Sequence, residues 1–296
     1  MKKVNIKQLA VAAGLALGSA TALASHVPAF GFNAQQFIVN PLSVGETFAP
    51  FTAGAINFSY TSEVDQFGGT GASANFNQTG AATFGTFLTG VGGTPIGAGT
   101  TGLNLGPSTT GYSLYALFSG AGTATTINPS TPSASVNGTY SSFNVNVFVD
   151  GSNNTTFANT GADDFGFSRF VSGGGGEDIL VLTGSLVPGA GGFHISSGLA
   201  NGDFDVIFNI TGFGGTTFFS TNTAGVPLTR GDFNGVISTF GPNVAFPPAN
   251  FTDGDVRGSG NVSLEGTPSR VPEPGSMALV GLALTGLAFS RRKSRT

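Results

Sequence analysis

Apolar and polar residues alternate along several short stretches of the chain. Residues 143–151 (FNVNVFVDG) and 203–210 (DFDVIFNI) are the clearest, because nearly every second side chain in them is apolar. A period of two places the apolar side chains on one face of a β-strand. Similar patterns occur in residues 56–60, 113–118, 178–186 and 261–266. The middle of the chain has no stretch of eleven or more residues with helical periodicity and caps, so the pattern predicts a β protein.

Turn signals that contain glycine separate these stretches. The chain has 48 Gly and 15 Pro. Asn-Gly and Asp-Gly pairs are typical of tight hairpin turns. Such pairs begin at Asn137, Asp150, Asn201, Asn234 and Asp253. Residues 68–111 and 119–139 are rich in Gly, Thr and Ser, a composition that predicts loops.

Many short strands with Gly-rich connections indicate a β-sandwich or a β-barrel. Of the two we predict an all-β, β-sandwich-like domain, a jelly roll or a related fold with Gly-rich loops, as one unit over residues 25–270. The 28 Phe residues would form its core, since the chain has no Trp. Hydrophobic residues make up 40% of the chain, which favours a folded domain over disorder.

Positive charge is concentrated at the two ends of the chain. Residues 25–274 contain no Lys, and their four Arg and all fifteen Asp and Glu residues give a net charge of −11. Nucleic-acid binding needs clustered Lys or Arg, so this acidic stretch argues against a nucleic-acid partner. The chain has no Cys, which excludes disulfides, thiolate nucleophiles and Cys metal sites.

The first 24 residues have the three parts of a secretory signal. Three Lys residues precede an apolar stretch at residues 9–17, and Ala22-Leu23-Ala24 supplies small residues at the positions that signal peptidase reads. This order predicts an N-terminal signal helix, residues 1–24, removed by cleavage between Ala24 and Ser25. An uncleaved amphipathic helix is the alternative.

The other end, residues 271–296, reads VPEPGSMALVGLALTGLAFSRRKSRT. The prolines of Pro272-Glu273-Pro274 exclude helix and force an extended segment, which a protease cleft can hold. Residues 275–290 are apolar and uncharged. As a C-terminal transmembrane helix these sixteen residues would span about 24 Å, slightly less than a hydrocarbon core of ~30 Å.

A basic tail, residues 291–296, follows the apolar stretch. Its cations are Arg291, Arg292, Lys293 and Arg295. The positive-inside rule keeps such a tail in the cytoplasm, so the middle of the chain would lie outside the inner membrane. A short helix that contains Gly281 and Gly286 makes a poor permanent anchor, which favours a transient stop before processing over a simple C-terminal anchor.

Residues 271–296 resemble the sorting segment of the PEP-CTERM proteins of Gram-negative, exopolysaccharide-making bacteria. The Pro-Glu-Pro triplet, the apolar span and the basic end stand in the same order, behind a secretory signal. The resemblance implies recognition by an exosortase, a membrane-embedded cysteine protease that removes the helix near the triplet. The processed protein would then reach the cell surface or the extracellular matrix.

Four stretches of the middle resemble parts of the flocculation-associated PEP-CTERM proteins. They are residues 37–41 (FIVNP), 110–122 (TGYSLYALFSGAG), 177–186 (EDILVLTGSL) and 202–220 (GDFDVIFNITGFGGTTFFS). This resemblance implies a non-enzymatic extracellular protein that helps cells to aggregate within an exopolysaccharide matrix. Its expected partners outside the cell are exopolysaccharide or further copies of itself. No functional residue of the middle is carried over from the family.

A polysaccharide-active enzyme that uses paired carboxylates is the alternative function. The available pairs are Asp163/Asp164, Glu177/Asp178, Asp203/Asp205 and Asp253/Asp255. Adjacent acids are more often solvated loop charges, and the lack of Trp argues against a sugar-binding cleft. A Ser-His-Asp triad needs a positioned His, and the chain has only His26 and His194. We therefore assign no catalytic residue.

The stretch 253–265 (DGDVRGSGNVSLE) resembles the start of an EF-hand loop. Arg257 and Leu264 stand where the fifth and twelfth residues of such a loop would bind the ion, so it is not an EF-hand. An irregular calcium site in a β loop and a plain acidic turn both stay open. No cofactor and no metal-binding residue is assigned.

Overall fold

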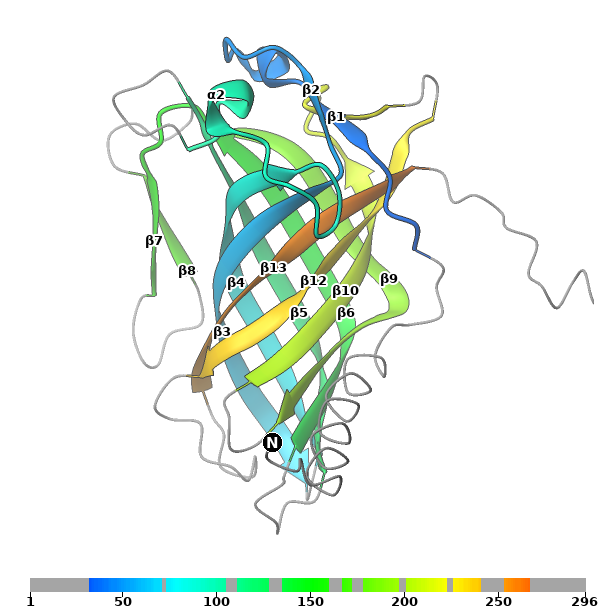
Figure 1. Ribbon diagram of the computed structural model, residues 1–296. Coiled ribbons are helices and arrows are strands. Elements are labelled where there is room, and N and C mark those ends of the chain that lie inside the picture. The colour runs from blue at the N-terminus through cyan, green and yellow to red at the C-terminus, as the bar shows by residue number, and fades with distance from the viewer. Residues whose placement is uncertain are drawn as a thin grey trace, which may run out of the picture.

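The computed structural model describes nine stretches of the chain. They are residues 32–70, 73–104, 111–127, 135–159, 167–171, 178–196, 201–222, 226–240 and 253–266. Their dominant feature is a closed barrel of eight long strands, as Figure 1 shows. The strands are β3 (Ala55–Thr70), β4 (Ser73–Leu88), β5 (Ser113–Ile127), β6 (Ser135–Asp150), β9 (Ile179–Ser196), β10 (Asn201–Gly212), β12 (Leu228–Phe240) and β13 (Asp253–Gly266).

The strand order around the barrel is β10-β12-β13-β3-β4-β5-β6-β9, and every neighbouring pair is antiparallel. The predicted β-sandwich is therefore wrong. Two pairings close the sheet on itself, β9 with β10 and β13 with β3. Strands of 12 to 18 residues are long enough to tilt and coil around a common axis, which a barrel requires.

Smaller elements lie around the barrel. A three-stranded sheet, in the order β11-β1-β2, is made by β1 (Phe37–Val39), β2 (Phe51–Ala53) and β11 (Phe219–Thr221). Two short helices, η1 (Pro41–Val44) and α2 (Ala98–Thr101), lie at the same end of the barrel, the upper end in Figure 1. A separate hairpin of β7 (Thr155–Asn159) and β8 (Phe167–Val171) stands beside the barrel wall.

Aromatic rings fill the barrel. The ring of Phe58 packs against those of Phe84, Phe204 and Phe233, with centroids 5.2–6.2 Å apart. Along β4 and β6 buried side chains alternate with more exposed ones, so one face of each strand points inward. The prediction that Phe forms the core is confirmed for the described residues. The outward-facing side chains of the eight strands are called the outer wall below.

Glycines inside the barrel make room for these rings. A β-carbon on Gly231 or Gly184 would collide with the ring of Phe208. Gly138 is covered in the same way by Phe193, which belongs to the neighbouring strand. Many of the glycines are thus part of the core packing rather than of turns.

Four of the five predicted turns are wrong. The Asn-Gly and Asp-Gly pairs that begin at Asn137, Asn201, Asn234 and Asp253 all lie within strands. Only the pair at Asp150 is confirmed, because β6 ends there and a turn follows at Gly151. The predicted Gly-rich loops are likewise wrong over much of their length, since they contain β4 and parts of β5 and β6.

No helix among the described residues is long and apolar enough to cross a membrane. The structure therefore gives no support to the predicted transmembrane helix. The apolar stretch 275–290 and the predicted signal helix, residues 1–24, both lie outside the described residues.

Candidate functional site

A groove of about 400 Å³ lies on the outer wall, where β3, β4 and β5 meet the turn after α2 and the start of β7. Its polar lining consists of uncharged amides and hydroxyls. These side chains are Asn57, Ser59, Thr83, Asn104, Ser113, Asn153 and Thr155. Asn57, Ser59 and Thr83 are exposed, so the groove opens to solvent. The lining contains no Lys, Arg, His, Asp or Glu.

Two asparagines fix the loops on either side of the groove. Asn104 and Asn153 have backbone φ angles of 56° and 52°, the only positive values for residues other than glycine in the described part of the chain. Asparagine adopts this left-handed conformation more readily than most residues because its short side chain can bond locally. The Asn104 amide donates to the carbonyl of Phe84 at 2.8 Å, and the Asn153 amide donates to that of Gly111 at 2.9 Å.

An aromatic ring from β7 completes the groove. Phe157 is partly exposed, and its ring meets Tyr115 edge-on with centroids 5.2 Å apart. Tyr115 is only 2% exposed, and its other neighbour is Phe148, stacked at 5.1 Å with 17° between the rings. Phe157 is thus packed on Tyr115, which is itself stacked on Phe148, while part of the Phe157 surface faces solvent.

Two carboxylates stand behind the groove and hold its lining. Asp178 accepts hydrogen bonds from the Tyr115 hydroxyl at 2.8 Å and from the Thr155 hydroxyl at 3.1 Å. Asp150 accepts from the backbone N–H of Ser152 at 3.0 Å and of Thr155 at 2.8 Å, and from the Ser113 hydroxyl at 3.4 Å. Hydrogen bonds to carboxylates are stronger than those between neutral groups, so the lining is held in place without a ligand.

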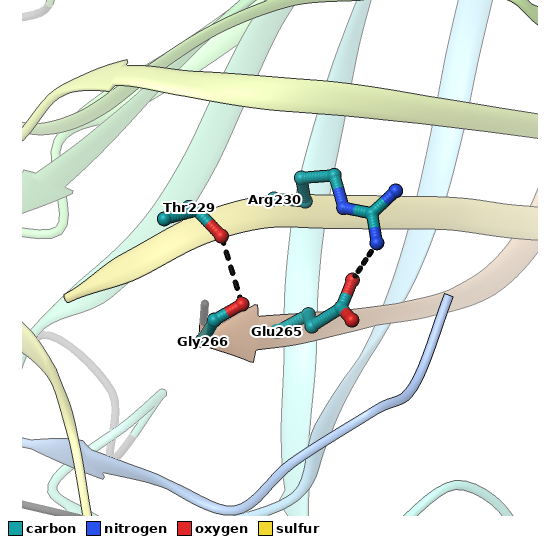
Figure 2. A network of polar contacts seen from close by, with 4 residues as sticks. All are labelled: Thr229, Arg230, Glu265 and Gly266. Atoms are coloured by element: carbon teal, nitrogen blue, oxygen red, sulfur yellow. Dashed lines mark hydrogen bonds and ion pairs between the residues drawn. The ribbon is translucent and has the colours of Figure 1, made fainter. Parts of the chain in front are cut away.

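A second polar cluster lies on the outer wall of β12 and β13. The Arg230 guanidinium lies 2.7 Å from the Glu265 carboxylate, and the Thr229 hydroxyl donates to the carbonyl of Gly266 at 2.8 Å. Figure 2 shows both contacts. The two charged side chains are 13% and 1% exposed. Burial raises the pKa of Glu265, while Arg230 and a backbone hydrogen bond from Asn33 act in the opposite direction. The pair is therefore a structural contact between neighbouring strands.

Two aspartates on neighbouring strands, Asp205 of β10 and Asp232 of β12, interact near this ion pair. Burial raises the pKa of Asp232 to about 8, and the neighbouring charge of Asp205 and a hydrogen bond to it add to the effect. The Asn234 amide, which donates to Asp232 at 2.8 Å, works in the opposite direction. One of these two carboxyls therefore carries a proton near neutral pH. Of the predicted pair Asp203/Asp205, only Asp205 belongs to this arrangement, because Asp203 lies opposite His194 and Val236.

Hydrogen-bonded carboxyls have the wrong spacing for glycoside hydrolysis. Such a bond brings two oxygens to roughly 2.5–3 Å. Retaining glycosidases hold their carboxyls about 5 Å apart and inverting ones farther, since sugar or water lies between them. The Asp205–Asp232 contact is a direct hydrogen bond, which differs from the spaced carboxyls of both classes.

The remaining predicted pairs are Asp163/Asp164, Glu177/Asp178 and Asp253/Asp255. Asp163, Asp164 and Glu177 lie outside the described residues, and Asp178 is bonded to Tyr115 and Thr155. Asp253 and Asp255 belong to β13, so the predicted acidic turn is a strand. Within the described ranges no three His, Cys, Asp or Glu side chains are grouped so that they could hold a metal ion.

The histidine considered for a catalytic triad, His194, lies on β9 and contacts a neighbouring strand. His194 Nδ1 lies 2.5 Å from the side-chain oxygen of Asn137 on the neighbouring strand. His26 lies outside the described residues.

The predicted sorting and cleavage residues also lie outside the described part of the chain. They are Ala24 and Ser25, Pro272, Glu273 and Pro274, and the tail residues Arg291, Arg292, Lys293 and Arg295. The groove, in turn, was missed by the sequence analysis. Its Asn, Ser and Thr residues are of types that recur throughout the chain, so their composition gave no signal.

Comparison with known protein families finds the PEP-CTERM protein-sorting motif at residues 270–293. This range contains the Pro-Glu-Pro triplet, the apolar stretch and the first part of the basic tail. Neither the curated proteins nor the solved structures gave a match. The described part is thus an eight-stranded antiparallel barrel with a polar groove on its outer wall. The chain carries the sorting signal of an exosortase-targeted surface protein.

Proposed function

We propose that this protein is an exported, non-enzymatic component of the cell surface or extracellular matrix that supports floc or biofilm formation together with exopolysaccharide. The sorting motif at residues 270–293 carries the proposal, because it gives the chain a route out of the cell. Signal peptidase would cut after Ala24, and an exosortase would process the other end near Glu273. The barrel would then act outside the cell.

The outer wall suits contact with a hydrated polymer. Hydroxyl pairs join neighbouring strands along it, Ser59 with Thr83 at 3.2 Å and Thr123 with Thr139 at 3.2 Å. These side chains are exposed and both donate and accept hydrogen bonds, as sugar hydroxyls do. Each contact is weak, but repetition along a polymer raises the overall affinity. Exopolysaccharide is therefore favoured as the partner.

Self-association through strand edges has less support. The eight barrel strands pair around a closed circle, so the barrel presents no unpaired edge to another copy. Many of its Phe rings are also buried in the interior.

The enzyme alternative rests on the Asp205–Asp232 pair. A shared proton between two carboxyls is also found in aspartic proteases. Here, however, Asp232 accepts a hydrogen bond from the Asn234 amide, and the two carboxyls on neighbouring strands are joined directly by a hydrogen bond, unlike the spaced carboxyls of glycosidases. We therefore favour a structural role for the pair.

Deletion of the gene tests the proposal in the producing bacterium. Growth rate and polysaccharide synthesis should be unchanged, while cells disperse and polysaccharide passes into the medium. Aggregate size and the soluble polysaccharide fraction are measured, and the strain is complemented with the full chain as the control. Aggregation and retention that match the parent would show the proposal to be wrong. Polysaccharide of altered length or composition would favour the enzyme.

A further inference from the structure

We infer that the groove between the outer wall and β7 binds a short stretch of an uncharged polysaccharide chain. This inference rests on the proposed function and names the site and the chemical class of its ligand. A volume of about 400 Å³ falls within the range of known small-ligand sites, ~300–1,000 Å³. Because the groove is open along exposed residues of β3 and β4, a polymer can enter without threading an end.

The lining matches the hydrogen-bonding chemistry of sugars. Each sugar hydroxyl both donates and accepts, and so do the side chains of Ser59, Thr83 and Asn57 that face the groove. A charged ligand would find no opposite charge among the lining residues. The carboxylates of Asp150 and Asp178, directly behind the lining, would repel an acidic polymer. An uncharged chain is therefore the class that the electrostatics favour.

The aromatic side of the groove supplies the apolar contact that a sugar ring needs. Phe157 presents a partly exposed ring beside the hydroxyl lining. The C–H face of a sugar could pack on that ring while its hydroxyls reach the opposite wall. Tyr115 and Phe148 behind it keep the ring in place, so little conformational entropy is lost on binding.

The loops are already held in a binding-competent shape. Asn104 and Asn153 fix the two loop walls by their bonds to Phe84 and Gly111. Asp150 fixes the start of β7 through the Thr155 N–H. Pre-organisation of this kind lowers the cost of binding, and it would be unnecessary if the groove were only a gap where β7 leaves the barrel.

The test uses the mature protein recovered from the culture medium and the matrix polysaccharide of the same bacterium, separated by anion exchange into uncharged and acidic fractions. The wild type should bind the uncharged fraction in affinity electrophoresis. The double variant Ser59→Ala/Thr83→Ala should bind about tenfold more weakly, because two hydroxyl contacts are lost. The matched control is Ser73→Ala/Thr125→Ala, which removes an equivalent exposed hydroxyl pair on β4 and β5 outside the groove. Phe157→Ala should also weaken binding.

Equal binding by the groove variant and its control would overturn the inference, and so would binding to the acidic fraction alone or to neither fraction. The same variants are returned to the deletion strain. If deletion disperses the cells but the groove variant restores full aggregation, the inference fails while the proposed function stands. If the groove binds the uncharged fraction but deletion leaves aggregates intact, the proposed function fails while the binding site stands.

Discussion

The ring of Phe208 occupies the space that a β-carbon on Gly231, its cross-strand partner, would need. Gly184, on the strand to the other side, leaves the same ring room in the same way. One large side chain on β10 thus spreads over two neighbouring strands that have no side chain there. Such pairing of rings with glycines lets a narrow barrel hold many Phe residues.

The first prediction concerns this contact. Gly231→Ala should lower the free energy of unfolding by roughly 1–3 kcal/mol, because the new methyl group forces Phe208 or the strand to move. Gly85→Ala is the control, since a β-carbon on Gly85 has nothing within 4 Å. Urea unfolding of both variants measures the difference. Phe208→Leu should reduce the cost of Gly231→Ala, and equal stability of the two glycine variants would contradict the packing argument.

The raised pKa of Asp232 predicts that the stability of the protein depends on pH. This pKa is about 8 in the folded protein and near 3.8 when unfolded, so the folded state binds more protons between these values. The contribution of Asp232 to the free energy of unfolding is fully present below about pH 4. It falls as the pH rises to about 8, by roughly 1 kcal/mol per pH unit. Asp232→Asn cannot ionise and should flatten this fall. Urea unfolding across this pH range provides the measurement, and an unchanged slope in the variant would refute the argument.

The Arg230–Glu265 pair gives a third prediction. Arg230→Met should cost roughly 3–5 kcal/mol, because it leaves the buried Glu265 carboxylate without its partner. Adding Glu265→Gln to that variant should recover part of the loss. Arg257→Met removes an exposed guanidinium from β13 and should change stability by less than about 0.5 kcal/mol. A similar cost for both Arg variants would mean that the buried charge is not the cause.

The sorting signal gives a fourth prediction. Glu273→Ala should leave export intact but prevent removal of the C-terminal segment, because the triplet offers one charge for a protease to read. The variant should stay with the cells and keep the mass of its tail, as measured by fractionation and mass spectrometry. Ser276→Ala keeps the triplet and should be processed normally. Normal release of the Glu273 variant would show that the triplet is only a spacer.

Strands were more predictable than their arrangement. Residues 143–151 and 203–210 fall almost entirely within β6 and β10, because a period of two directly reflects which side chains point inward. Inward and outward residues alternate in a sandwich and in a barrel alike. The closing contact of β13 with β3 joins segments about 200 residues apart, and nothing local to either segment specifies it.

The turn signals failed for a definite physical reason. Asn234-Gly235 has the sequence of a hairpin turn, but it lies in β12, where a β-carbon on Gly235 would meet the backbone of β13 and the ring of Phe204. Sequence alone does not distinguish a glycine that bends the chain from one that admits a neighbouring ring.

The candidate site could not be predicted from the sequence, for a related reason. Ser59 and Phe157 lie in different elements about 100 residues apart, and neither belongs to a charged or metal-binding pattern. Asp205 was proposed with Asp203 because the two lie close in sequence. Its partner is Asp232, which the pairing of β10 with β12 brings to the same outer face.

Closure of the barrel has a consequence for the proposed role outside the cell. In the barrel the backbone groups of each strand are already paired on both sides, so a crowded matrix gives them no template for fibre growth. In the proposed matrix role, a cell could then accumulate this protein to high density between its neighbours, and surface side chains could change to adjust cohesion without affecting the fold.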